Sequence, residues 1–377
     1  MRVIILLALT LCLSTPAYSA ILTKTIGTSS RDYSTIQLWE DDLDDGTNAA
    51  NDATAYSASD DAIGEVYNDS AFDEAIVIAG GATVGLSTVT LTVPSAERHD
   101  GTAGTGARIV RTSGVFTIRT TIPNGRGDAY VVEWLEIDDN DQGAGWVDTS
   151  TSSAFDNSVF RNMIMHEGKS DGQTIAFKGN NRGALVINCI FYNHSRTTGG
   201  TTMAVAVRVR NPNSGIINST VYNVSNPNGT GHATAVSITD DDADGSVRNT
   251  IAMGTTVGGT GTAADFIYPG TNPTITNNMS EDATADDQGT NHLISKTTAN
   301  QFVSTTGGSE DLHLKSGSDA IDAGAEIGTS PTNVEIDIDG VDRTVINNWD
   351  IGVHDFIAAA PSNSEINAST LQASTIN

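Results

Sequence analysis

The chain has 377 residues, a net charge of −27 and only two cysteines. A negative field of this size repels nucleic acid and anionic membrane surfaces, which excludes nucleic-acid binding as an expected function. It also disfavours the binding of uronate polymers unless cations bridge the two surfaces.

Residues 1–19 are typical of an export signal. Arg2 supplies a positive start, an unbroken apolar run extends from Val3 to Leu13, and Ala17 and Ser19 place small residues at a cleavage site. No later stretch approaches the roughly 20 apolar residues that a membrane helix needs. We therefore expect a secreted protein, extracellular or periplasmic, that does not insert into a membrane.

Residues 20–60 are expected to form an N-terminal cap with one short helix. The sequence at 34–37 is a capping box, and Ile36, Trp39 and Leu43 then fall on one helical face. An amphipathic helix before a long β region is suited to covering the open first rung of a solenoid.

From residue 61 to residue 310, short apolar runs alternate with Gly, Asn, Asp and Thr, which predicts strands joined by turns. Five runs align on an asparagine, and each repeat carries a second strand. We call these asparagines the Asn ladder: Asn162, Asn188, Asn218, Asn249 and Asn277, at intervals of 26, 30, 31 and 28 residues. Such a near-period predicts an all-β fold, a single right-handed parallel β-helix.

Period-2 alternation predicts which columns of this β-helix face inward. The residues two before and two after each ladder Asn are mostly apolar, as with Val186 and Ile190 around Asn188. These columns and the Asn side chains are therefore expected to point into the coil. The column directly after the Asn, which includes Met163 and Cys189, is expected to face outward. A buried amide needs partners, and Asn side chains one rung apart can bond one another, so the ladder is predicted to be structural.

Three stretches carry a family resemblance: residues 31–39 (RDYSTIQLW), residues 97–109 (ERHDGTAGTGARI) and residues 312–324 (LHLKSGSDAIDAG). They resemble segments of exported bacterial or phage-borne right-handed β-helix proteins of the pectin-lyase-like superfamily. The resemblance implies a terminal rung and closing region at residues 311–357, where Arg343 is expected to pair with a carboxylate. It implies no single activity, because members include lyases, hydrolases and adhesins. Residues 358–377 are expected to be a disordered tail.

The first candidate site is a charged column beside the second strands. Lys178 and Arg208 each lie ten residues before a ladder Asn, and Arg210 follows shortly after. All three are predicted to face outward, next to an acidic loop. β-elimination of a uronide needs a base near C5 and cations that neutralise the sugar carboxylate. These residues are therefore the candidate catalytic set of a lyase, although a solvated face with ion pairs between rungs gives the same pattern.

The acidic loop is the candidate metal site. Asp240, Asp242 and Asp244 occupy positions 1, 3 and 5 of a Ca²⁺-binding loop, with Gly245 at position 6. Position 12 is Ile251 rather than Glu, so only a partial site is predicted. Ca²⁺ is the one cofactor that the sequence suggests.

A third column stands four residues after the ladder and holds His166, Tyr192, Tyr222 and Met253. If the column faces outward, its rings lie about 4.8 Å apart and are suited to stacking on sugars. If it faces inward, it is ordinary core packing. The apolar column before it competes for the interior, which favours the outward alternative and makes His166, Tyr192 and Tyr222 candidate glycan-binding residues.

The leading prediction is a non-enzymatic secreted β-helix protein that presents a lateral face to a polysaccharide or cell-surface glycan. The alternative is a Ca²⁺-dependent uronate lyase, and a further alternative is a rod-shaped virion or envelope component. The motifs of pectate lyases and polygalacturonases are missing from the sequence, as is a Gly-x-Ser-x-Gly elbow. Oligomeric state is left open.

Overall fold

The computed structural model describes residues 19–43, 56–81, 84–113, 116–120, 130–140, 147–148, 158–170, 174–179, 183–196, 203–210, 213–227, 230–238, 245–268, 274–346 and 348–358. The predicted export signal up to residue 18, the tail from residue 359 and the candidate metal ligands Asp240, Asp242 and Asp244 lie outside these residues.

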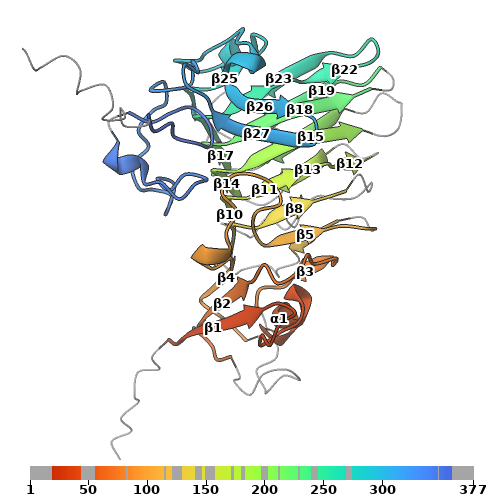
Figure 1. The fold of residues 1–377 in the computed structure, drawn as a ribbon, viewed down its shortest axis with the longest axis vertical. Coiled ribbons are helices and arrows are strands. Elements are labelled where there is room, and N and C mark those ends of the chain that lie inside the picture. Colours follow the sequence, from red (N-terminus) through yellow and green to blue (C-terminus); the bar gives the residue numbers. More distant parts are fainter. Residues whose placement is uncertain are drawn as a thin grey trace, which may run out of the picture.

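Parallel strands stack into a solenoid with three sheets along its length (Figure 1). Sheet A contains β1 (Ile21–Ile26), β2 (Asp61–Val66), β4 (Thr88–Thr92), β7 (Tyr130–Glu133), β10 (Val159–Arg161), β14 (Leu185–Ile187), β17 (Gly215–Ile217), β20 (Ser246–Arg248) and β24 (Thr274–Thr276). Sheet B contains β5 (Arg108–Val110), β8 (Glu136–Asp138), β11 (Ile164–His166), β15 (Ile190–Arg196), β18 (Thr220–Asn226), β21 (Ile251–Met253) and β25 (Met279–Ser280). Sheet C contains β3 (Ile76–Ile78), β6 (Ile118–Thr120), β9 (Val147–Asp148), β13 (Thr174–Gly179), β16 (Ala204–Val209), β19 (Ala233–Ile238) and β23 (Ala263–Ile267).

The predicted all-β parallel β-helix is confirmed, since successive coils pair in parallel register in all three sheets. Its right-handed sense stays a prediction from the general rule for parallel crossovers. Short additional elements are β12 (Lys169–Ser170), β22 (Thr256–Val257) and the 3₁₀ turns η1 (Ser95–Glu97), η2 (Thr284–Asp287), η3 (Thr298–Asn300) and η4 (Arg343–Val345).

The first coil is covered by α1 (Ile36–Leu43), which lies beside β1, β2 and β3 (Figure 1). Trp39 is buried and packs so closely on β2 that a Cβ at Gly64 would lie 2.7 Å from its ring. The carboxylate of Glu74 accepts the Ile36 and Gln37 amides, both at 2.9 Å. It therefore satisfies amides at the start of the helix that have no partner within the helix, which is the role expected of a capping box. The Gln37 side chain instead bonds the backbone of β3 and fixes the helix to sheet C.

Each ladder Asn forms the corner between a sheet A strand and a sheet B strand. All five have a left-handed backbone, with φ between 48° and 53°. Asn tolerates this conformation better than most residues, which explains its recurrence. The corner amides continue the rung-to-rung pairing, as where Asn188 N donates to Ile217 O at 3.0 Å.

The predicted inward direction of the Asn side chains is wrong. Asn162 Nδ2 donates to Asp337 O at 2.6 Å, and Asn277 Nδ2 donates to Ala323 O at 2.9 Å, so both reach outward to the closing region. The column after the Asn, exemplified by Cys189, belongs to the interior cluster. Alternation fails here because it holds only along an extended strand, whereas a left-handed residue turns the chain. Burial raises the pKa of the Cys189 thiol to about 12.

The residues two after each Asn were also predicted to face inward, and this too is wrong. Ile164, Ile190 and Ile251 lie on the outer face of sheet B, in a cluster with apolar residues of the closing region. The interior at this level is instead filled by the next column, which includes Met165 and Phe191.

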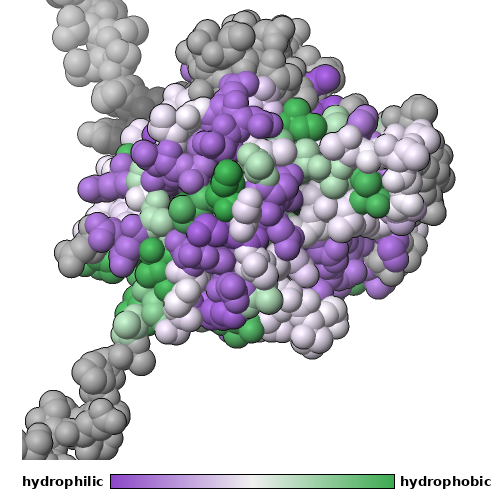
Figure 2. Space-filling view, turned by 90° about the horizontal axis from the view of Figure 1, so that it is seen from above, coloured by the Kyte–Doolittle hydropathy of each residue, from purple (hydrophilic) through white to green (hydrophobic). Residues whose placement is uncertain are grey.

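After β25, residues 281–301 close the far end of the coil. Ala285 of η2 joins the interior cluster, and Thr284 Oγ1 accepts the Phe266 amide at 2.9 Å, which occupies a donor on the last strand of sheet C. Figure 2 views the molecule from this end, and its coloured surface is mostly hydrophilic or neutral, with apolar residues in small separate areas. Residues 281–301 thus cover the strand edge that the last coil would otherwise expose.

The chain then folds back along the outside of the solenoid. β26 (Phe302–Thr306) and β27 (Ser309–Leu314) form an antiparallel hairpin that crosses sheet B (Figure 1). The closing region continues along the Asn ladder and onto sheet A, where Trp349 and Val334 pack on Ile187 and Ile217. Residues far apart in the sequence therefore meet on the lateral face.

The closing region is stabilised by Arg343, the arginine that was expected to pair with a carboxylate. Arg343 has no exposed surface and donates to Asp355 Oδ1 at 2.9 Å, so its predicted pairing with a carboxylate is confirmed. It also donates to Gly352 O at 3.0 Å. Burial raises the pKa of the Asp355 carboxyl to about 6, and the charge of Arg343 acts against that rise.

Candidate functional site

The candidate catalytic column lies on sheet C. Lys178 of β13 pairs in register with Arg208 of β16, on the side opposite the interior residues Phe177 and Val207. The Arg208 side chain is buried, whereas Arg210 lies exposed just beyond β16. The structure thus brings Lys178 and Arg208 together, while the acidic loop expected beside them lies outside the described residues.

The candidate glycan-binding column lies on sheet B. His166, Tyr192, Tyr222 and Met253 pair in register from coil to coil. Their neighbours Met165 and Phe191 fill the interior, so the column faces outward. The closing hairpin covers its later part: Met253 is fully buried, and Tyr222 meets Phe302 with ring centroids 6.2 Å apart. His166 and Tyr192, at the start of the column, line a cavity.

These two rings are parallel to within 3° with centroids 5.0 Å apart. Each ring therefore covers part of one face of the other. They form a single stacked unit, rather than the strip of open ring faces that the sequence suggested.

Two adjoining cavities lie over this unit. The larger, of about 500 Å³, has residues 102–104 and 308–310 as its walls, with Arg108, Glu136, Asp138, His166 and Tyr192 on sheet B below. The smaller, of about 300 Å³, includes Lys169, Asn193, Asn223 and Thr305. Both are lined by Glu167 and Glu310, so they meet there. We call the two together the sheet B groove.

One wall of the groove is the loop that contains the ERHDG sequence. His99 Nε2 donates to Asn162 O at 2.9 Å, and burial lowers the pKa of His99 to about 4, which keeps it neutral. Asp100 Oδ1 accepts Thr102 N at 3.1 Å and Thr105 Oγ1 at 2.9 Å, which fixes the turn. A Cβ at Gly106 would lie 2.3 Å from His99 N, so only glycine fits this approach.

The same loop meets the closing hairpin. A Cβ at Gly101 would lie 2.5 Å from His313 Nε2 on β27. His313 in turn contacts Asp311 and Asp339, at 2.5 Å and 2.9 Å. Two of the segments that carry the family resemblance therefore lie side by side, and the first of them forms one wall of the groove.

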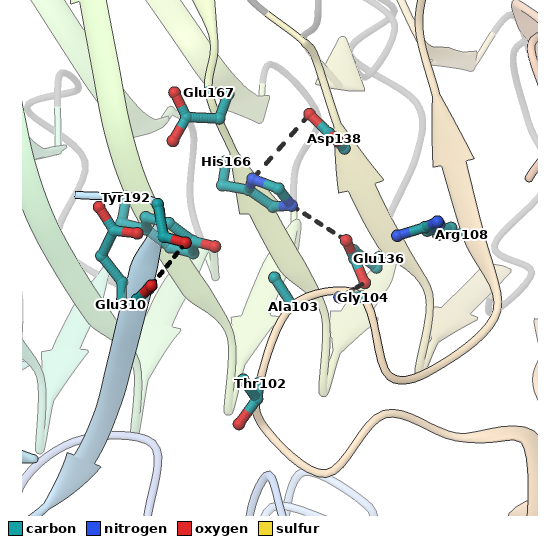
Figure 3. Close-up of a pocket in the computed structure, with 12 residues that line it drawn as sticks. Thr102, Ala103, Gly104, Arg108, Glu136, Asp138, His166, Glu167, Tyr192 and Glu310 are labelled. Atoms are coloured by element: carbon teal, nitrogen blue, oxygen red, sulfur yellow. Dashed lines mark hydrogen bonds and ion pairs between the residues drawn. The ribbon is translucent and has the colours of Figure 1, made fainter. Parts of the chain in front are cut away.

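The floor of the larger cavity contains a carboxylate–imidazole–carboxylate array (Figure 3). His166 Nε2 lies 3.0 Å from Glu136 Oε1, and His166 Nδ1 lies 4.0 Å from Asp138 Oδ1. Glu136 Oε2 accepts the Gly104 amide at 2.6 Å, which ties the floor to the wall. Arg108 stands next to Glu136 on the preceding rung.

Where the two cavities meet, the side-chain amide of one asparagine donates hydrogen bonds to two carboxylates. Asn193 Nδ2 donates to Glu167 Oε1 at 2.5 Å and to Glu310 Oε1 at 2.7 Å. Asn193 Oδ1 accepts Asn223 Nδ2 at 2.7 Å. Burial raises the pKa of the Tyr192 hydroxyl, and the nearby carboxylates, Glu310 foremost, raise it further. Tyr192 is thus held neutral in an acidic setting.

The residues at the junction of the two cavities were not predicted from the sequence, although the sequence contains one signal for them. Glu167, Asn193, Asn223 and Gly254 each lie five residues after a ladder Asn, and all four have positive φ, from 55° to 74°. They form a second left-handed column, at the point where sheet B strands bend. The hairpin residue Glu310 carried no such signal.

No protein-family model, curated protein or solved structure matches this chain. Among the described residues, no three His, Cys, Asp or Glu side chains are arranged to hold a metal ion. Within that same part of the chain, no helix is long and apolar enough to span a membrane. The function is therefore argued from the geometry of the groove.

Proposed function

We propose that this protein is exported and binds a polysaccharide or cell-surface glycan in the sheet B groove. The observation that carries the proposal is the pair of joined cavities, about 500 and 300 Å³, which are of the size of known ligand sites. They adjoin one another on the lateral face of the solenoid, as a site for several linked sugars would require.

The chemistry of the lining supports a polyhydroxylated ligand. Carboxylates such as Asp138 accept hydrogen bonds, and hydroxyls and amides such as Asn193 can both donate and accept them. The left-handed turns and the tie between Glu136 and Gly104 hold the site rigid before a ligand arrives, which lowers the entropy lost on binding. Membership of the pectin-lyase-like superfamily is part of the proposal and rests on the three sequence stretches named above.

A Ca²⁺-dependent uronate lyase on sheet C is the second candidate, favoured by the adjacent register of Lys178 and Arg208. It predicts a rise in ultraviolet absorbance, from the unsaturated product, when the protein is incubated with uronate polymers and Ca²⁺. That rise should disappear with EDTA and in Arg208→Ala. If absorbance does not rise with any polymer of a broad panel, this candidate is ruled out.

Binding in the groove is tested with a glycan array and a steric block. Ser309 is exposed and lines the larger cavity, so Ser309→Trp should fill the groove and abolish retention of any glycan that the wild type holds. Ser316 is exposed on the same region but lines neither cavity, so Ser316→Trp is the matched control and should bind as the wild type does. Equal binding by wild type and Ser309→Trp would refute the proposed site, as would a wild type that retains no glycan.

A further inference from the structure

We propose that the sheet B groove selects an oligosaccharide with free amino groups, whose ammonium groups are held at two acidic points of the groove. The inference rests on the proposed function, because it names the class of glycan that this site would take. The two points are the gap between His166 and Asp138, and the junction between Glu167 and Glu310.

The charges that line the groove are mainly negative. Glu136, Asp138, Glu167 and Glu310 contribute four carboxylates, whereas the cationic side chains are Arg108 in the larger cavity and Lys169 in the smaller. The whole chain adds a net charge of −27. Such a field concentrates cations and repels a uronate.

At the first point, two hydrogen-bond acceptors face each other. A neutral His166 imidazole would carry its proton on Nε2, which lies 3.0 Å from an accepting oxygen of the Glu136 carboxylate. Nδ1 is then an acceptor, and it lies 4.0 Å from Asp138 Oδ1, too far for a hydrogen bond between them. His166 is only 7% exposed, and its Nδ1 has no hydrogen-bond partner among the described residues. A donor placed between the two acceptors would satisfy both.

At the second point, two carboxylates share one donor. Because Asn193 Nδ2 lies 2.5 Å from a Glu167 oxygen and 2.7 Å from a Glu310 oxygen, those oxygens lie within about 5.2 Å of each other. Like charges this close repel, and a bound cation removes the repulsion. Figure 3 shows Glu167 and Glu310 on the same side of the cavity as Tyr192.

An ammonium group fits both points better than a sugar hydroxyl. It carries three donor hydrogens and a positive charge, whereas a hydroxyl has one donor hydrogen and no charge. Beside the second point, in the smaller cavity, Asn193, Asn223 and Thr305 offer partners for neutral hydroxyls. A saccharide supplies both kinds of group at once, and an isolated lysine side chain supplies only the ammonium.

The test is calorimetric titration of the full mature protein with three tetrasaccharides: one of glucosamine, its N-acetylated counterpart and one of galacturonate. At a pH where the amine is protonated, the amino form should bind at least about tenfold more tightly than the other two, and salt should weaken it. Asp138→Asn and Glu310→Gln should each weaken binding of the amino form about tenfold or more, and weaken binding of the acetylated form by a smaller factor. Glu326→Gln removes the same charge from an exposed site on the closing region and should have no effect.

The outcomes separate this inference from the proposed function. Equal binding of the amino and acetylated forms, or preference for galacturonate, would overturn the amino-group inference and leave glycan binding intact. No binding of any saccharide would overturn both. If a lysine tetrapeptide bound as tightly as the amino form, the groove would be a site for cationic peptides, and the inference would be wrong.

Discussion

Replacing Asn188 in the Asn ladder should loosen the closing region from the solenoid, and two substitutions can separate the causes. The Asn188 side chain has no exposed surface, and its Nδ2 donates to Ile336 O at 2.6 Å and to Val334 O at 3.3 Å. Asn188→Gly removes these bonds but keeps the left-handed backbone, whose φ is 51°. Ile336 O keeps Asn162 Nδ2 as a donor and Val334 O keeps Asn218 Nδ2, so the loss is that of the Asn188 hydrogen bonds themselves, about 0.5–1.5 kcal/mol each. Asn188→Ala adds about 1–2 kcal/mol of backbone strain.

The assay is urea unfolding followed by tryptophan fluorescence, because Trp349 of the closing region packs on Ile187 and Ile217 of the solenoid. The expected order of stability is wild type, then Asn188→Gly, then Asn188→Ala. Asn291→Gly is the control, since Asn291 is exposed and left-handed at φ 63°, and it should change stability by less than about 0.5 kcal/mol. Wild-type midpoints in both Asn188 variants would show that the ladder does not hold the closing region.

Two further predictions concern charged groups of the closing region. Burial lowers the pKa of His313, but Asp339 and Asp311 outweigh burial and raise that pKa to about 9. The stability that His313 contributes should therefore be complete below about pH 6.5 and be lost as pH rises through 9. The free energy of unfolding, measured across this range, should fall in the wild type but not in His313→Gln, and parallel curves would contradict the reasoning. Arg343→Met should destabilise the fold by about 3–5 kcal/mol, because it leaves Asp355 buried without its cation. Adding Asp355→Leu should recover part of that loss, as measured by thermal unfolding. An Arg343→Met variant as stable as the wild type would refute the role of this pair.

The sequence was sufficient to predict the solenoid, because the spacing of the Asn ladder and the short apolar runs report the length of each coil. It was not sufficient for the direction of side chains near the corners. Asn188 and Ile190 were both placed inside by strict alternation, which a left-handed corner interrupts. A corner resets the alternation, so the pattern on one strand does not extend to the next.

The groove could be predicted only in part. His166 and Tyr192 were found because they form an outward column within the repeats. Glu310 reaches the groove from 117 residues beyond Asn193, on a hairpin that belongs to no repeat. The partial burial of Tyr222 has the same origin, since Phe302 of that hairpin packs against it. Local pattern cannot show which lateral face a returning segment will cover.

Hydrogen exchange of the protein with its tightest saccharide tests the central claim most directly. If the groove is the binding site, the ligand should slow exchange at residues 102–104, 192–195, 305 and 307–310, which line its two cavities. Sheet C around Lys178 and Arg208 should exchange as in the free protein. Protection confined to sheet C would contradict the account, as would a saturated complex with no change at either wall of the groove.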